Sequence, residues 1–281
     1  MKKHLSTILL VVALLAGVSL LLYPSLSNYW NSLHATQVVS NYAQQVQTMD
    51  RSRYETMWDD AVAYNRSLLT RSTDFALTDA QKRQYDALLN VDGTGIIGYL
   101  EIPVLEVTLP IYHGTDDSVL QVGAGHIDWT SLPTGGESTH CVLSGHRGLP
   151  SARLFSDLDQ LVAGDTFVIR VLDEVLTYEV DQILIVEPAD VSALTIEDGK
   201  DLCTLVTCTP YGINSHRLLV RGHRVESQAE TQAARVTSDA IQIEPLIVAP
   251  IVALPILLVL LIILLVPGKK PDGGKKNAKT E

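Results

Sequence analysis

Cysteine is scarce in this sequence, basic residues are outnumbered, and the usual metal-binding patterns are missing. Three cysteines in 281 residues cannot build a framework of paired disulfides, because one thiol is left over. A formal net charge of −11 argues against a surface made for nucleic acid. No H-E-x-x-H, C-x-x-C or H-x-H pattern occurs, so we expect neither a metal centre nor another cofactor. The hydrophobic fraction of 46% excludes a disordered or fibrous chain.

Apolar residues are concentrated at the two ends of the chain. Residues 5–23 and 246–266 carry no charged side chain, and each run has close to the length of about 20 residues that crosses a bilayer as a helix. For the first run the alternative is a cleaved signal peptide, but the run is longer than a typical signal core and no A-x-A site follows it. Lysines flank the outer side of both runs. We therefore predict two membrane spans, cytoplasmic termini and an extracellular middle part.

Between these runs, the pattern changes from helical to β near Gly95. Residues 28–90 contain no proline and are predicted to be helical, with an interruption at 72–75 and a second helix that begins at an N-cap, Thr78. The short apolar runs after Gly95 are typical of an antiparallel barrel or sandwich rather than a βαβ fold. One helix is expected to interrupt them near residues 152–161. The strand candidates are residues 96–102, 105–109, 139–145, 166–171, 174–187, 202–208 and 216–223.

These patterns divide the chain into six parts. They are a cytoplasmic stub with an N-terminal anchor at 1–27, an extracellular helical prefix at 28–92, a β-barrel domain at 93–225, a stalk at 226–245, a transmembrane helix at 246–266 and a basic cytoplasmic tail at 267–281. A β domain of roughly 130 residues is large enough to bury a core of its own.

The three cysteines differ in their sequence context. Cys141 and Cys203 lie within apolar strand candidates, so we expect small buried side chains, with a disulfide between the two as the less favoured alternative. Cys208 ends a strand and runs into Thr-Pro-Tyr-Gly, which is typical of a side chain presented at the rim of a barrel. Because residues 203 and 208 are an odd number apart, their side chains are expected on opposite faces of the strand.

Two further strand ends carry chemically useful groups. His146 lies where a strand runs into a glycine turn, and a hairpin is expected to return Arg217 close to Cys208. A thiol, an imidazole and a guanidinium together permit acyl transfer. Cys208 is the candidate nucleophile, His146 the acid and base for the leaving and incoming amines, and Arg217 the group that stabilises the oxyanion.

A metal site is the competing use of the same residue types. We do not favour it, because none of the histidines has the spacing of a ligand pair. His216 and His223 are expected at the surface or in polar networks. The available side chains are His113, His126, His140, Cys141, His146, His216 and His223.

Four segments resemble the class C sortases. Residues 204–222, which read TLVTCTPYGINSHRLLVRG, are similar to the active-site strand pair of that class, and residues 144–152, SGHRGLPSA, to its histidine segment. The stretches 111–115 and 130–133 are also similar. T-L-x-T-C is specific to sortases, and the C-T-P-Y-G-I-N run to the pilin-polymerising class. The resemblance covers residues 85–225, and two membrane segments are also typical of the class.

This resemblance implies an eight-stranded sortase β-barrel with Cys208, His146 and Arg217 as its catalytic residues. It implies cleavage of an LPxTG-like sorting signal between Thr and Gly, followed by transfer of the pilin to a lysine amine of a second pilin on a Gram-positive cell. The implied partners are proteins with such signals, the acceptor lysine and the membrane. One alternative is a sortase that attaches single proteins to peptidoglycan, and another is a membrane-bound binding or scaffold protein without catalysis.

One segment departs from the class. Class C sortases usually carry an Asp-Pro-aromatic lid before the barrel, which covers the cysteine. Here Thr73, Asp74 and Phe75 occupy the corresponding place, and proline is absent from residues 25–102. Either Asp74 and Phe75 form a modified lid near residues 72–76, or this segment is an ordinary loop between helices.

Overall fold

The structure is a computed structural model and describes residues 2–70 and 75–226 of the chain. The predicted C-terminal membrane span at 246–266, nearly all of the stalk, and the basic tail lie outside the described residues. The described chain belongs to two units, which separate after Ser25. Each unit is considered by itself below.

Helix α1 runs from Lys2 to Gln47, and its residues 2–25 belong to the first unit. Among the described residues, α1 is the one helix that is long and apolar enough to cross a membrane, judged by length and composition. Its apolar side chains, such as Leu20 and Leu21, are exposed, unlike those of a helix that fills the core of a soluble domain. This agrees with an N-terminal membrane anchor.

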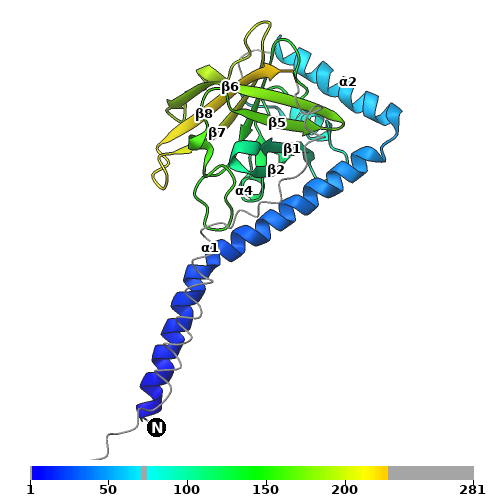
Figure 1. Cartoon of the computed structure of the whole chain (residues 1–281). Coiled ribbons are helices and arrows are strands. Elements are labelled where there is room, and N and C mark those ends of the chain that lie inside the picture. The colour runs from blue at the N-terminus through cyan, green and yellow to red at the C-terminus, as the bar shows by residue number, and fades with distance from the viewer. Residues whose placement is uncertain (1, 71–74, 227–281) are drawn as a thin grey trace, which may run out of the picture. The chain divides into compact units, whose positions relative to one another are not determined.

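The second unit contains a closed eight-stranded barrel, which confirms the β-barrel part of the predicted fold class (Figure 1). The strand order around the barrel is β1-β2-β3-β4-β7-β8-β6-β5. The strands are β1 Ile96–Ile102, β2 Val107–His113, β3 Ala124–His126, β4 Thr139–Ser144, β5 Thr166–Val171, β6 Glu174–Val186, β7 Asp201–Thr209 and β8 His216–Val225.

The barrel is mixed, and the expectation of an antiparallel barrel was wrong on this point. Strand β2 pairs with β3, and β4 with β7, in parallel. The chain leaves β4, forms the β5–β6 hairpin and only then returns as β7, and such a long connection allows two neighbouring strands to run in the same direction. Apolar alternation predicted seven of the eight strands and missed the three-residue strand β3, and it carries no information about the neighbour of a strand.

Short helices lie in the connections between the strands. The helix expected near residues 152–161 is not formed, because that segment consists of turns and a single 3₁₀ turn. Its apolar spacing has another cause, since Leu154, Phe155 and Leu158 are all buried in the core. The short helices are α4 Asp117–Leu120 and the 3₁₀ turns η1 Pro103–Leu105, η2 Leu158–Gln160 and η3 Ser192–Leu194.

The helical prefix packs onto the barrel core. Helix α2, Arg51–Leu68, buries Ala61 and Tyr64 in the same hydrophobic cluster as the barrel strands. Helix α3, Asp79–Ala87, begins at the predicted N-cap Thr78, whose side chain forms a capping box with Gln81.

Two buried tyrosine hydroxyls fix the prefix to specific strands. In the second part of α1, Tyr42 donates to the carbonyl of Ile97 and accepts from the amide of Leu172, both at 2.8 Å. The hydroxyl of Tyr85 in α3 lies 2.8 Å from Nδ1 of His126. These hydrogen bonds fix the positions of α1 and α3 against the barrel.

Candidate active site

The strand register brings Cys208 and Arg217 together. They are directly paired residues on the antiparallel strands β7 and β8. On the other side of β7, the parallel ladder with β4 ends at Ser144 and Val206. The pairing extends one residue further, because the Gly145 amide donates to the Val206 carbonyl at 3.0 Å.

His146 comes next in this extended ladder. The Thr207 hydroxyl donates to the Gly145 carbonyl at 2.8 Å, so the chain entering His146 runs beside the chain entering Cys208. The three residues singled out in the sequence therefore lie at the same end of three neighbouring strands.

Cys208 faces away from the barrel core. Alternation along β7 puts Cys203 and Leu205 in the core and Val206 and Cys208 on the opposite face. Cys203 is fully buried, whereas Cys208 is half-buried. The expectation that the two thiols point to opposite faces is confirmed.

His146 has a carboxylate near its imidazole. Nε2 of His146 lies 3.7 Å from Oδ1 of Asp117, and the histidine side chain is 32% exposed. Asp117 is the first residue of α4 and pairs electrostatically with His146 only when the imidazole is protonated. Asp117 was not predicted. The two consecutive aspartates at 116 and 117 were its only signal in the sequence.

The guanidinium of Arg217 is held by the backbone. Nη1 donates to the carbonyl of His216 at 3.1 Å and to the carbonyl of Asn214 at 3.4 Å. Within the described chain, the hydrogen bonds of this guanidinium go to backbone carbonyls and not to a carboxylate. Its positive charge is therefore available to an oxygen atom of a ligand.

Gly145 is required by the packing under the histidine. A Cβ atom at this position would lie 2.6 Å from the ring of Phe155, which is closer than side-chain carbons approach one another. The Phe155 amide also donates to the His146 carbonyl at 3.1 Å. The glycine allows the histidine turn to lie directly on this ring.

An apolar surface continues from Cys208 along the outer face of the barrel. We call it the outer-face cluster, and it is centred on the buried residues Val142, Leu194, Val206 and Leu219. The partly buried side chains packed against these four are Ile127, Trp129, Leu184, Val186, Val191 and Ala193. Val206 precedes Cys208 on the same face of β7, so the apolar surface reaches the thiol.

A buried polar network holds the β6–β7 connection over this surface. Nδ1 of His140 lies 2.8 Å from the Thr195 carbonyl, and Nε2 lies 2.7 Å from the Thr204 hydroxyl. Arg221 forms ion pairs with Asp181 and Glu197. Burial lowers the pKa of His140, which keeps its imidazole neutral.

Phe75 contacts the outer-face cluster. Its ring packs edge-on against Trp129 with 4.8 Å between the ring centroids, and 45% of the residue is exposed. Asp74, the other residue of the possible lid, lies outside the described residues.

The remaining cysteines lie inside the barrel. Cys141 and Cys203 are register partners on β4 and β7, and both are buried free thiols rather than the disulfide considered as an alternative. Burial raises the pKa of the Cys203 thiol far above its usual value, which makes this thiol unreactive.

The other histidines also differ in their surroundings. His126 is buried against Tyr85 and the Ser131 carbonyl, whereas His216 and His223 are exposed. Burial lowers the pKa of His113. Within residues 2–70 and 75–226, no group of three or more His, Cys, Asp or Glu side chains is arranged to hold a metal ion.

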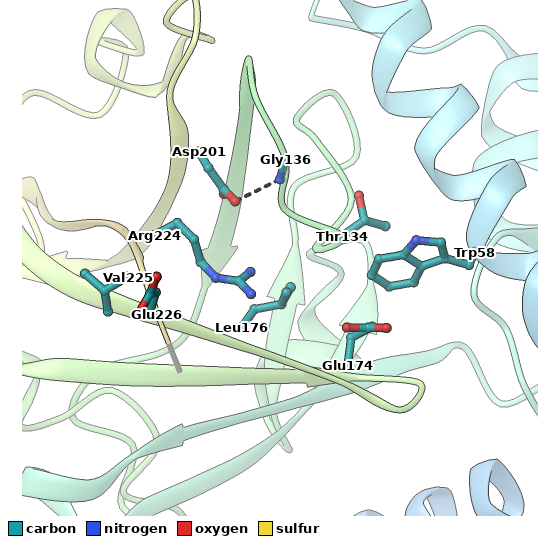
Figure 2. A pocket seen from close by; sticks show the side chains of 9 residues that line it. All are labelled: Trp58, Thr134, Gly136, Glu174, Leu176, Asp201, Arg224, Val225 and Glu226. Carbon is teal, nitrogen blue, oxygen red and sulfur yellow. Dashed lines mark hydrogen bonds between the residues drawn. The ribbon is translucent and has the colours of Figure 1, made fainter. Parts of the chain in front are cut away.

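A cavity of about 520 Å³ lies elsewhere on the barrel (Figure 2). Asp201, the first residue of β7, lines it, and seven steps along the extended strand lead from Asp201 to Cys208, roughly 23 Å. The Asp201 carboxylate accepts hydrogen bonds from the Gly136 amide at 2.8 Å and from the Tyr178 hydroxyl at 3.0 Å. This cavity is therefore separate from the candidate active site.

Comparison with known proteins identifies relatives of the barrel. Residues 100–225 match the sortase domain model. The chain is 34% identical over 131 residues to Sortase D of Bacillus subtilis. The aligned region is 46% of this chain and 63% of Sortase D, so the chain spans slightly less than two thirds of that protein.

Two crystal structures are similar over most of the described chain. For sortase C1 of Streptococcus agalactiae, the TM-score is 0.66 at 49% identity, covering 68% of this chain and 99% of that one. Clostridium perfringens sortase C was solved with the C-terminal cell wall sorting motif. Its TM-score is 0.61 at 39% identity, and the match covers 69% of this chain and 100% of that one.

Proposed function

The chain belongs to the sortase family of cysteine transpeptidases, and from this we propose that it joins pilin subunits through isopeptide bonds. The substrate is an LPxTG-like sorting signal, which the enzyme cleaves between Thr and Gly. The class C sortases among its structural neighbours support this proposal. So does the position of Cys208, His146 and Arg217 at one end of three adjacent strands, which is the observation that carries it.

In the first half of the reaction, the Cys208 thiolate attacks the carbonyl carbon of the threonine and a C–S bond forms. Arg217 donates hydrogen bonds to the oxyanion that develops on the threonine oxygen. When this intermediate collapses, the Thr–Gly C–N bond breaks and protonated His146 gives its proton to the leaving amine. The product is a thioester between the pilin and Cys208.

In the second half, a lysine ε-amine attacks the thioester. His146, now neutral, takes a proton from the attacking amine. The new C–N bond forms, the C–S bond breaks and Cys208 returns as the thiolate. The same histidine therefore acts once as an acid and once as a base, and no cofactor is required.

The partly buried side chains packed against the outer-face cluster are suited to bind the apolar residues of the sorting signal. The four central residues of the cluster lie beneath the β6–β7 connection, and the cluster approaches the thiol along Val206. A peptide lying along this face would present its threonine carbonyl to Cys208. The Clostridium perfringens neighbour was solved with a sorting motif, which supports a peptide site in this fold.

Membrane attachment is part of the proposal. The apolar beginning of α1 is suited to anchor the enzyme, with the barrel outside the cell. The sequence suggests a second anchor at 246–266. Two anchors would hold the catalytic domain close to membrane-bound pilin precursors.

The decisive experiment compares cells that carry the native protein with cells that carry Cys208→Ala. Wall extracts are boiled in detergent and probed for surface proteins with LPxTG-like tails. We expect a ladder of high-mass species that the variant lacks. Cys203→Ala is the matched control, because this thiol lies on the same strand but faces the core, and it should keep the ladder.

Three other outcomes are informative. Loss of single wall-attached proteins without any ladder would indicate a sortase that anchors proteins to peptidoglycan. An identical pattern in both cell lines would contradict the proposal if the isolated barrel also forms no thioester with a sorting-signal peptide. A thioester in that assay would instead identify a redundant enzyme in the cells.

A further inference from the structure

A buried cation lies directly beside the candidate active site, and the reaction described above does not use it. Arg147 follows His146, and only 9% of its side chain is exposed. Arginine is rarely buried to this extent, because removing a guanidinium from water is costly unless it is paired. Its burial next to a catalytic histidine therefore requires an explanation.

The guanidinium of Arg147 connects three segments of the chain. It forms an ion pair with Asp159 in η2. Nη1 donates to the hydroxyl of Thr209, the residue that follows Cys208, at 3.4 Å. Its central carbon lies 5.9 Å from the ring centroid of Tyr211, in the β7–β8 connection. One side chain thus links the turn of His146 to the strand end of Cys208.

The surrounding backbone leaves little room for movement. The Gly148 amide donates to the Ser156 hydroxyl at 3.1 Å, and a Cβ atom at Gly148 would lie 2.9 Å from the Tyr211 ring. Tyr211 therefore covers the turn after His146. Nε of Arg147 is buried without a hydrogen-bond partner among the described residues, so the ion pair, the hydroxyl contact and the ring contact carry its positioning.

We propose that Arg147 is a positioning residue that sets the separation between His146 and Cys208. This inference deepens the proposed function and rests on it. The planar guanidinium can form an ion pair, donate a hydrogen bond and stack on a ring at the same time, whereas a lysine ammonium can form the ion pair but cannot make all three contacts. Small errors in the placement of two catalytic groups cost large factors in rate.

The alternative is that Arg147 only stabilises its own loop through Asp159. The two roles differ in what Arg147→Lys restores. If Arg147 positions the catalytic residues, lysine recovers thermal stability but not the rate. If it only stabilises the loop, lysine recovers both together.

The test uses the full chain and three variants: Arg147→Ala, Arg147→Lys and the control Arg153→Ala. Arg153 belongs to the same loop and forms an ion pair with Asp157, its neighbour four residues along the chain. For each protein we would measure Tm, the kcat and KM for a sorting-signal peptide, and the pH dependence of Cys208 alkylation by iodoacetamide.

For Arg147→Ala we expect kcat to fall roughly 10- to 100-fold with little change in KM. The pH profile of Cys208 alkylation should also differ from that of the native protein, because the distance between the thiol and the imidazole has changed. Arg147→Lys should regain the Tm but not the kcat. Arg153→Ala should lower Tm and leave both kcat and the alkylation profile unchanged.

Two results would overturn the inference. One is an Arg147→Ala protein whose folded fraction has native kcat and a native alkylation profile. The other is full recovery of rate by Arg147→Lys. If the native protein does not process the peptide, the proposed function fails, and the alkylation profiles still decide whether Arg147 positions the thiol.

Discussion

Cys208 and Arg217 face one another as paired residues on strands β7 and β8, on the face of the barrel that carries the outer-face cluster. The hairpin between them holds Asn214 and His216, whose carbonyls bind the guanidinium. The pairing of β7 with β8 therefore fixes the position of the Cys208 thiol, and the connection between these strands fixes the Arg217 guanidinium. In the proposed reaction, a single hairpin would therefore position both the nucleophile and the oxyanion-binding group.

Replacing Arg217 should affect catalysis far more than folding. If Arg217 has the proposed role, we expect kcat of Arg217→Ala to fall on the order of 100- to 1,000-fold, because the oxyanion loses its cationic hydrogen-bond donor. Tm should change little, since the side chain is half-exposed and binds only loop carbonyls. Peptide kinetics and mass spectrometry of the thioester would test this. An Arg217→Ala enzyme with more than half the native kcat would contradict the proposed role.

The three thiols should differ sharply in reactivity. In the native protein we expect one rapidly labelled thiol, Cys208, because Cys141 and Cys203 are buried in the core. In denaturant without a reductant, all three should react, since the structure contains free thiols. Titration with a chromogenic disulfide reagent counts the reactive thiols of the native and of the unfolded protein. A single reactive thiol after unfolding would reveal a Cys141–Cys203 disulfide and contradict the structure.

The lid hypothesis predicts a change at Phe75. If the segment around Phe75 shields the thiol, Phe75→Ala should speed the labelling of Cys208, and Phe75→Tyr should behave like the native protein. The ring packs against Trp129, so a change in tryptophan fluorescence verifies that the contact was lost. An unchanged labelling rate together with altered fluorescence would reject the lid.

Local periodicity predicted seven of the eight strands of this barrel, missing β3, but not their arrangement. Alternation of buried and exposed residues is a property of one strand, and the predicted 166–171 coincides with β5. The parallel partnership of β4 and β7 depends on segments far apart in the sequence, which no local pattern reports. The false helix near 152–161 arose because the turns around Phe155 bury apolar side chains at helix-like intervals.

The candidate active site shows the same difference between local sequence patterns and contacts across the fold. Cys208, His146 and Arg217 were identifiable because each ends or begins a strand beside turn residues. Asp117 and Arg147 were not, because their importance comes from contacts across the fold, with His146 and with Thr209 respectively. A charged residue in a loop has the same appearance in sequence whether it is solvated or buried.

Tyr42 should contribute strongly to stability. Its buried hydroxyl satisfies the carbonyl of Ile97 and the amide of Leu172, so Tyr42→Phe leaves two buried backbone groups without partners. We expect a loss of about 1–3 kcal/mol in the free energy of unfolding. Urea unfolding of the native protein and of the variant measures this difference in the free energy of unfolding. Tyr29→Phe is the control, because this side chain is exposed, and it should be neutral.

Acid should destabilise the barrel through its buried histidines. Burial lowers the pKa of His113 and of His140, so both imidazoles are neutral in the folded protein. In the unfolded chain they take up protons as the pH falls through about 6.5. The unfolded state then binds more protons than the folded state, and the free energy of unfolding decreases as the pH drops from neutral toward the lowered pKa values.

The contribution of His140 can be isolated by mutation. Its imidazole is faced by Arg221, which also lowers its pKa, and by Glu197 and Asp181, which raise it, and burial outweighs these opposing charges. His140→Gln should reduce the loss of stability between pH 7.5 and 5.5, measured as the shift of the urea midpoint. His216→Gln, at an exposed site, is the matched control and should retain the native shift. Equal shifts in the native protein and in His140→Gln would show that the acid sensitivity lies elsewhere.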